Sequence, residues 1–159
     1  MLDSAAAAPS GFTVGALSLK ETHLLRLTLD DTLPVIVAVP KYKFKVTSTL
    51  LFNQDQPDLL RVDMQLEATA RPAGTSRTAV KASARITVAV IFQYDGLEAL
   101  QKSGELPIDL GWTAVSIAYS TVRGIFQARL AGTSFDKALL PIVSPQSLWQ
   151  PPVTPPAGD

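Results

Sequence analysis

The side chains best suited to chemistry are few, and they are scattered along the sequence. His23, the one histidine of the chain, lies two residues after Glu21 and could act as a general base. Asp30 and Asp31 could supply one arm of a metal site, although adjacent carboxylates before Thr32 more commonly cap a turn. A chain with one histidine and no cysteine cannot build a typical zinc site. We therefore expect an ordinary strand histidine and a capped turn.

A row of lysines could bind phosphate. Lys41, Lys43 and Lys45 alternate along one strand-like segment and would line a single face of it. Asp63 and Glu67 are expected on the same outer face of a neighbouring strand. Because lysines protect exposed sheets from aggregation, a solvated sheet surface is the favoured interpretation.

No set of residues in the sequence forms a catalytic constellation. Arg123 and Arg129, on a predicted helix, are expected to pair with carboxylates at an interface rather than to serve a site. The sequence has no Gly-x-Ser-x-Gly, no Walker-type phosphate loop and no Gly-x-Gly-x-x-Gly. Basic and acidic residues number 14 each, so no global field favours nucleic acid or an anionic membrane. We expect no enzyme activity, no metal, no cofactor and no nucleic-acid partner.

Length and composition indicate one domain. The chain has 159 residues, and we expect a single domain over 11–150 between a flexible segment 1–10 and a Pro-rich, disordered tail 151–159. The N-terminal segment lacks the basic and apolar regions of a secretory signal, and no apolar run is long enough to span a bilayer. A soluble protein that acts where it is made is the simplest expectation.

Three segments alternate between apolar and polar residues. The apolar positions are Tyr42, Phe44, Val46, Leu50 and Phe52, then Leu60, Val62, Met64 and Leu66, then Ile86, Val88, Val90, Phe92 and Tyr94. This period predicts antiparallel strands covered on one face, and turn-forming residues between them predict a meander. Residues 12–29 predict a fourth strand with a β-bulge next to Gly15. Residues 25–29 either continue that strand or begin a second segment.

The longest predicted element is a helix over 110–130, with Asp109 as a candidate N-cap and Gly132 just past its end. Its polar residues recur at steps of three and four and form one stripe: Thr113, Ser116, Ser120, Arg123 and Gln127. The other faces are almost wholly apolar, which is more than packing against one sheet requires. We therefore expect the helix to cover the sheet on one side and to meet another subunit along the polar stripe.

Short helices are predicted over 97–102 and after Ser144, where Pro145 takes the first helical position. The predicted fold class is therefore α+β, with a four-stranded antiparallel meander sheet, one long helix packed on one face and a short C-terminal helix.

Five short motifs occur in order within residues 11–150. They are Phe12–Leu17, Val90–Glu98, Tyr119–Gly124, Ala131–Thr133 and Leu140–Trp149. Their order and spacing resemble the SecB family of protein-export chaperones, and its divergent SecB-like branch more closely than the classical one. The resemblance implies a bacterial, cytoplasmic homotetramer, built as a dimer of dimers, that binds unfolded polypeptide in apolar grooves without nucleotide.

The resemblance leaves the export motor ATPase open as a partner. Classical members contact that motor through an acidic surface, whereas here lysines are mixed with acids on the outer face. Candidate groove residues are apolar groups at element ends, each of which could equally be core: Phe52, Tyr94, Leu97, Trp112, Leu148 and Trp149.

The expected function is an ATP-independent holdase chaperone, for export or for a dedicated client such as an antitoxin. Apolar burial is non-directional and therefore tolerant of client sequence. One alternative is a carrier of an apolar small ligand between helix and sheet. Another is a structural oligomer that binds no client.

Overall fold

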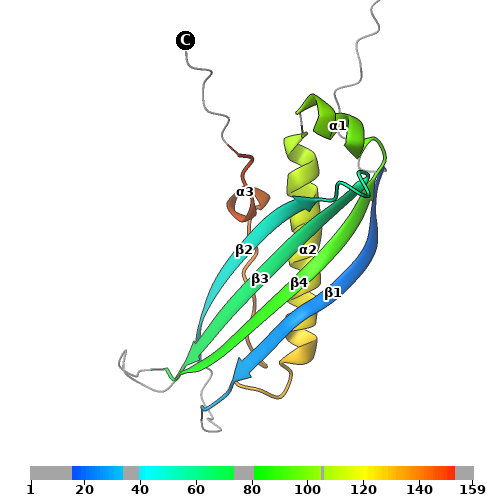
Figure 1. Cartoon of the computed structure of the whole chain (residues 1–159). Helices are drawn as coiled ribbons and strands as arrows, with labels where there is room; N and C mark the ends of the chain where they lie inside the picture. The colour runs from blue at the N-terminus through cyan, green and yellow to red at the C-terminus, as the bar shows by residue number, and fades with distance from the viewer. Residues whose placement is uncertain (1–15, 34–39, 74–80, 105, 153–159) are drawn as a thin grey trace, which may run out of the picture.

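One antiparallel sheet of four strands forms the framework, and a long helix crosses one of its faces obliquely (Figure 1). The computed structural model describes residues 16–33, 40–73, 81–104 and 106–152. The elements are β1 (Leu17–Asp30), β2 (Lys41–Phe52), β3 (Leu59–Arg71), β4 (Ala82–Tyr94), α1 (Leu97–Ser103), α2 (Ile108–Arg129) and α3 (Pro145–Leu148). The predicted α+β fold, with its long helix on the sheet and its short C-terminal helix, is confirmed.

The strands lie in the order β1-β4-β3-β2. The meander is formed by β2, β3 and β4 alone, whereas β1 lies at the edge next to β4. The prediction of a four-stranded meander is therefore wrong for its first strand, which would have to pair with β2. The registers align the apolar positions across the sheet, so that Val62 of β3 lies between Leu50 of β2 and Val90 of β4. On β3 and β4 these positions are fully buried, which is the single covered face that the period of two predicts.

β1 is one continuous strand with two register shifts against β4. The shifts fall at Lys20 and Leu25, so residues 25–29 continue the strand instead of beginning a second one. Each extra residue reverses the alternation. The bulge predicted next to Gly15 lies outside the described residues, as do the predicted flexible segment 1–10 and residues 153–159 of the tail.

α2 begins slightly earlier than predicted. Pro107 occupies the N-cap position, and its carbonyl accepts the first helical hydrogen bonds. The prediction of Asp109 as N-cap is therefore wrong: Asp109 lies in the first turn, where its negative charge favours the helix dipole. At the other end, the N–H of Leu130 still donates to the helix, and Gly132 has a left-handed φ of 76°. The predicted glycine at the helix exit is confirmed.

The two short helices form where the sequence predicted them. The N–H of Gly104, which has a φ of 71°, ends α1 by donating to the carbonyl of Gln101 at 3.1 Å. α3 follows Ser144 and has Pro145 at its first position. α1 and α3 lie toward the end of the sheet where β2 and β4 end (Figure 1).

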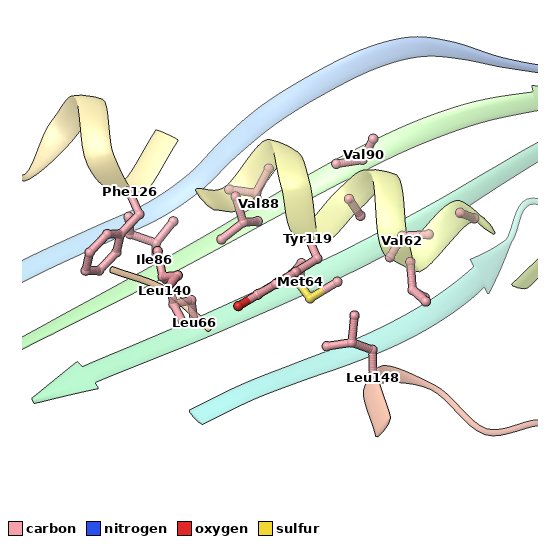
Figure 2. Close-up of a cluster of buried hydrophobic side chains, with 14 of the residues drawn as sticks. Val62, Met64, Leu66, Ile86, Val88, Val90, Tyr119, Phe126, Leu140 and Leu148 are labelled. Carbon is pink, nitrogen blue, oxygen red and sulfur yellow. The ribbon is translucent and has the colours of Figure 1, made fainter. Parts of the chain in front are cut away.

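The core fills the space between α2 and the middle strands. Figure 2 shows side chains of β3 and β4 directed toward Tyr119 and Phe126 of α2, with Leu140 and Leu148 alongside. The Tyr119 hydroxyl donates to the carbonyl of Pro141 at 2.7 Å and thereby ties the C-terminal segment to α2. Burial raises the pKa of Tyr119, opposed by the positive charge of Arg123. The hydroxyl therefore keeps its proton at neutral pH.

Four aromatic rings join β2, α2 and the connection that follows α2. Phe126 makes edge contacts with Phe44 and Phe135, at centroid distances of 6.3 and 6.0 Å. Tyr42 lies 6.2 Å from Phe44 and 6.1 Å from Phe135, and its hydroxyl donates to the carbonyl of Ser134 at 2.8 Å. Burial, then the charge of Asp136, raises the pKa of Tyr42. These contacts fix the exit of α2 against the sheet.

Gly111 permits the close approach of α3 to α2. A Cβ at this position would lie 2.3 Å from Cζ3 of Trp149, whose ring covers the helix backbone there. No real Cβ contact is that short, so any larger side chain displaces the tryptophan. The contact explains why a buried glycine stands in the first turns of a long helix.

Replacement of Gly111 by alanine is expected to destabilise the protein by about 1–3 kcal/mol through overpacking. The sign is informative, because the same change inside an unobstructed helix stabilises by about 1 kcal/mol. With Trp149 also replaced by alanine, Gly111→Ala should become neutral or stabilising. Urea unfolding at one protomer concentration measures both effects. Equal stabilisation in both backgrounds would show that the Trp149 ring moves aside freely.

Candidate functional site

The candidate catalytic residues do not assemble into a site. His23 Nε2 lies 2.7 Å from Glu21 Oε2 on the exposed outer face of β1, and both side chains are more than half exposed. Asp31 accepts hydrogen bonds from the backbone N–H and the hydroxyl of Ser134. It thus binds the connection after α2, 103 residues along the chain, and not the local turn at Thr32 that the sequence predicted. In the described part of the chain, no group of three His, Asp or Glu residues could hold a metal ion.

The basic candidates lie on two different surfaces. Lys41, Lys43 and Lys45 are exposed on the outer face of β2, where the register confirms that Glu67 faces Lys45. Arg123 of α2 lies with its Cζ 6.0 Å from the ring centroid of Tyr119. The described residues contain no ion pair of Arg123 or Arg129, so the pairing predicted for them at an interface stays a prediction.

The six candidate groove residues belong to elements that meet at one end of the molecule. Phe52 ends β2 and aligns through Leu60 with Phe92, near the end of β4. Trp112 lies in the first turns of α2, and Trp149 follows α3 and packs on Gly111. Figure 1 shows α1, α3 and the start of α2 at this end.

Burial divides these six residues into two groups. Tyr94, Leu97 and Leu148 are 6%, 0% and 7% exposed and form part of the core of the single chain. Phe52 is 41% exposed, and Trp112 and Trp149 are partly buried. Contact between these six residues and a client stays a prediction.

Sequence reasoning missed two exposed apolar residues at this end, Ile108 and Leu51, and Leu51 of β2 is 41% exposed. Ile108, in the first turn of α2, is 39% exposed. We call Phe52, Ile108, Trp112 and Trp149 the terminal apolar surface. The indole N–H of Trp112 is buried and has no acceptor in the described part of the chain. An unpaired buried donor is unfavourable.

A second apolar surface lies on the helix side of β1. The two bulges place Leu19, Leu24, Leu27 and Leu29 on one face, and these four residues are the leucine row. They are 50%, 37%, 37% and 42% exposed, because α2 packs on β3 and β4 and leaves β1 uncovered. Thr22, which aligns with Val90, lies on the same face between Leu19 and Leu24. A group of exposed leucines on one face marks an interaction surface. The sequence did not predict this surface, because the spacing of these leucines is also typical of residues in a protein core.

The polar stripe of α2 faces away from the sheet, as its spacing predicted. Ser120 and Gln127 are exposed, and Thr113, Ser116 and Arg123 are partly buried. The Ser120 hydroxyl donates to the carbonyl of Ser116 at 3.0 Å, so this side chain is turned back onto the helix. Use of this stripe as an interface stays a prediction.

These elements, in this order and packing, define a SecB-like fold. The structure is similar to that of the Mycobacterium tuberculosis SecB-like chaperone Rv1957, solved in complex with a ChAD peptide from the HigA1 antitoxin Rv1956. The TM-score is 0.57 at 13% sequence identity, over 82% of this chain and 91% of that chain. The fold expected from the resemblance to SecB is therefore confirmed, whereas function has to be argued from the surfaces.

No family model matches the sequence, and no curated protein matches it. Among the described residues, no helix combines the length and the apolar character needed to cross a membrane.

Proposed function

We propose that this chain is an ATP-independent holdase chaperone, a binding protein rather than an enzyme, that holds unfolded or non-native polypeptides. The observation that carries the proposal is the terminal apolar surface, with exposed Phe52 and Ile108, in a fold shared with a chaperone that was solved with a bound peptide. Exposed aromatic and aliphatic groups bind apolar segments of many sequences, because burial of apolar area is non-directional.

The proposed assembly is a homotetramer built as a dimer of dimers. Such an assembly requires two different self-complementary interfaces on each protomer. The leucine row and the polar stripe of α2 are two separate surfaces that could form these interfaces. The first is apolar, and the second carries hydroxyl side chains that permit close helix contact. Both would then be covered in the tetramer, and the terminal apolar surface would remain for the client.

The proposed place of action is the bacterial cytoplasm, either in protein export or on a dedicated client such as an antitoxin. The antitoxin peptide in the similar structure favours the dedicated role. An interaction with the export motor ATPase is less favoured. The outer face carries lysines on β2 and arginine-paired acids on β3, instead of a uniformly acidic surface.

A structural oligomer without client binding is the second candidate, and the leucine row is the observation that favours it. A carrier of an apolar ligand would need space between α2 and the sheet, where fully buried side chains such as Met64 and Phe126 pack (Figure 2). We therefore do not propose the carrier.

The purified chain is expected to suppress the aggregation of a chemically denatured protein without ATP, as measured by light scattering. Replacement of Phe52 and Ile108 by serine should weaken binding of the denatured protein about tenfold, because each loses part of an apolar contact of about 25 cal/mol per Å². The matched control replaces Leu139 and Ile142 by serine, since both are highly exposed on the segment before α3. Failure of the wild-type chain to slow aggregation would refute the holdase proposal.

A further inference from the structure

The outer face along β2 carries positive charges that lack carboxylate partners. Lys41, Lys43 and Lys45 are exposed on this face, and Arg71 of β3 lies directly opposite Lys41. We call these four residues the basic edge. Within the described part of the chain, none of them forms an ion pair with a carboxylate.

The nearest carboxylates are already engaged by other cations. Asp63 accepts from Nε and Nη2 of Arg61 at 2.6 and 3.1 Å, and this hydrogen bond raises the pKa of Arg61. Glu67 lies opposite Lys45 but forms its ion pair with Arg85 of β4, at 3.0 Å. The local charge along β2 is therefore positive, although the chain as a whole is neutral.

Arg71 lies on β3, one strand in from the edge, and adds its positive charge to the same outer face. Its Nε is buried and has no hydrogen-bond partner in the described residues.

β2 is also an edge strand of the sheet, with β3 as its one neighbour. On the side away from β3, its backbone groups have no strand partner in the described part of the chain. Its helix-side row, which includes Tyr42, Phe44 and Val46, is only partly buried. An edge with open backbone groups and half-covered apolar side chains is a template for an added strand.

We propose that the β2 edge takes up an extended segment of the client as an additional strand, with acidic side chains against the basic edge and apolar side chains on the helix side. This inference rests on the proposed chaperone function and specifies the client chemistry. An added strand alternates its side chains between the two faces, and opposite charges on neighbouring strands attract. The preferred client segment therefore alternates acidic and apolar residues.

The alternative is that the lysines only protect the edge from aggregation, as edge lysines often do. One feature favours the selective role. The lysines all lie on one face, so the helix-side row remains available to apolar side chains of an added strand. The same charges would disfavour basic segments, so the edge selects among strands.

The test uses labelled synthetic peptides of the length of β2, one alternating glutamate with valine and one alternating lysine with valine, with affinities from fluorescence anisotropy. The wild-type chain should prefer the acidic peptide by at least about tenfold at low salt. The K41E/K43E variant should lose that preference and bind the basic peptide more tightly. Because Glu at 41 would face Arg71, this variant introduces no repulsion with β3. The matched control, K20E/K137E, makes the same charge change at exposed positions away from β2 and should retain wild-type affinities.

A modified peptide tests separately whether the client pairs with the backbone of β2. The acidic peptide with alternate N-methylated residues cannot donate to β2, and it should bind about tenfold more weakly than the parent. Equal binding of both peptides to wild type and to K41E/K43E would overturn the charge selection and leave the chaperone proposal standing. Equal binding of the methylated peptide would overturn strand addition. No binding of either peptide, together with no suppression of aggregation, would overturn both proposals.

Discussion

Replacement of Phe126 by alanine is expected to lower the free energy of unfolding by about 3–5 kcal/mol, the largest effect of a single substitution that we predict. Phe126 is 1% exposed and contacts Phe44 of β2 and Phe135 of the connection after α2. Its removal leaves a cavity where three separate parts of the chain meet. The surrounding rings cannot collapse into it without moving the sheet relative to the helix.

Chemical unfolding at a fixed protomer concentration measures this loss, because association contributes to apparent stability. The matched control is Gln127→Ala, on the exposed side of the same turn, with an expected change within about 0.5 kcal/mol. A loss below about 1 kcal/mol for Phe126→Ala, well under the range for such cavities, would mean that the helix exit is not packed as described.

The double substitution of Leu24 and Leu27 by aspartate is expected to convert the proposed tetramer into dimers. Both leucines are 37% exposed in the single chain, so the protomer should tolerate the change, whereas the proposed interface would have to bury carboxylates without partners. Two-fold symmetry also brings like charges together. Light scattering gives the mass directly.

The matched control adds the same charges to the other face of β1, at His23 and Thr28, and should leave the assembly intact. Ser120→Arg tests the second interface, because a bulky cation on the polar stripe of α2 prevents close helix contact. Alone it should also yield dimers, and with the leucine-row variant it should yield monomers. Tetramers that survive the leucine-row variant would assign the exposed leucines a different role.

The site was only partly predictable. The aromatic and apolar residues at element ends were identified from position alone, and their elements do meet at one end of the molecule. Burial then separated accessible Phe52 from buried Leu97 and Tyr94, which the sequence could not do because core and groove use the same side chains. Ile108 was missed because α2 begins earlier than the expected cap indicated.

The sequence by itself determined the elements of this protein, because the alternation of side chains in β2, β3 and β4 and the length of α2 are local properties. The outward position of the helix stripe follows from the same periodicity. Only the tertiary structure decided that β1 pairs with β4 instead of β2, since strand order depends on contacts distant in sequence.

That one long-range choice leaves β2, with Lys41, Lys43 and Lys45, at a free edge. The leucine row has a different tertiary cause, because α2 packs on β3 and β4 and leaves β1 uncovered. A leucine or a lysine has the same local preference at the centre of a sheet as at its edge. What it does there is decided by its neighbours, and those are supplied by the fold.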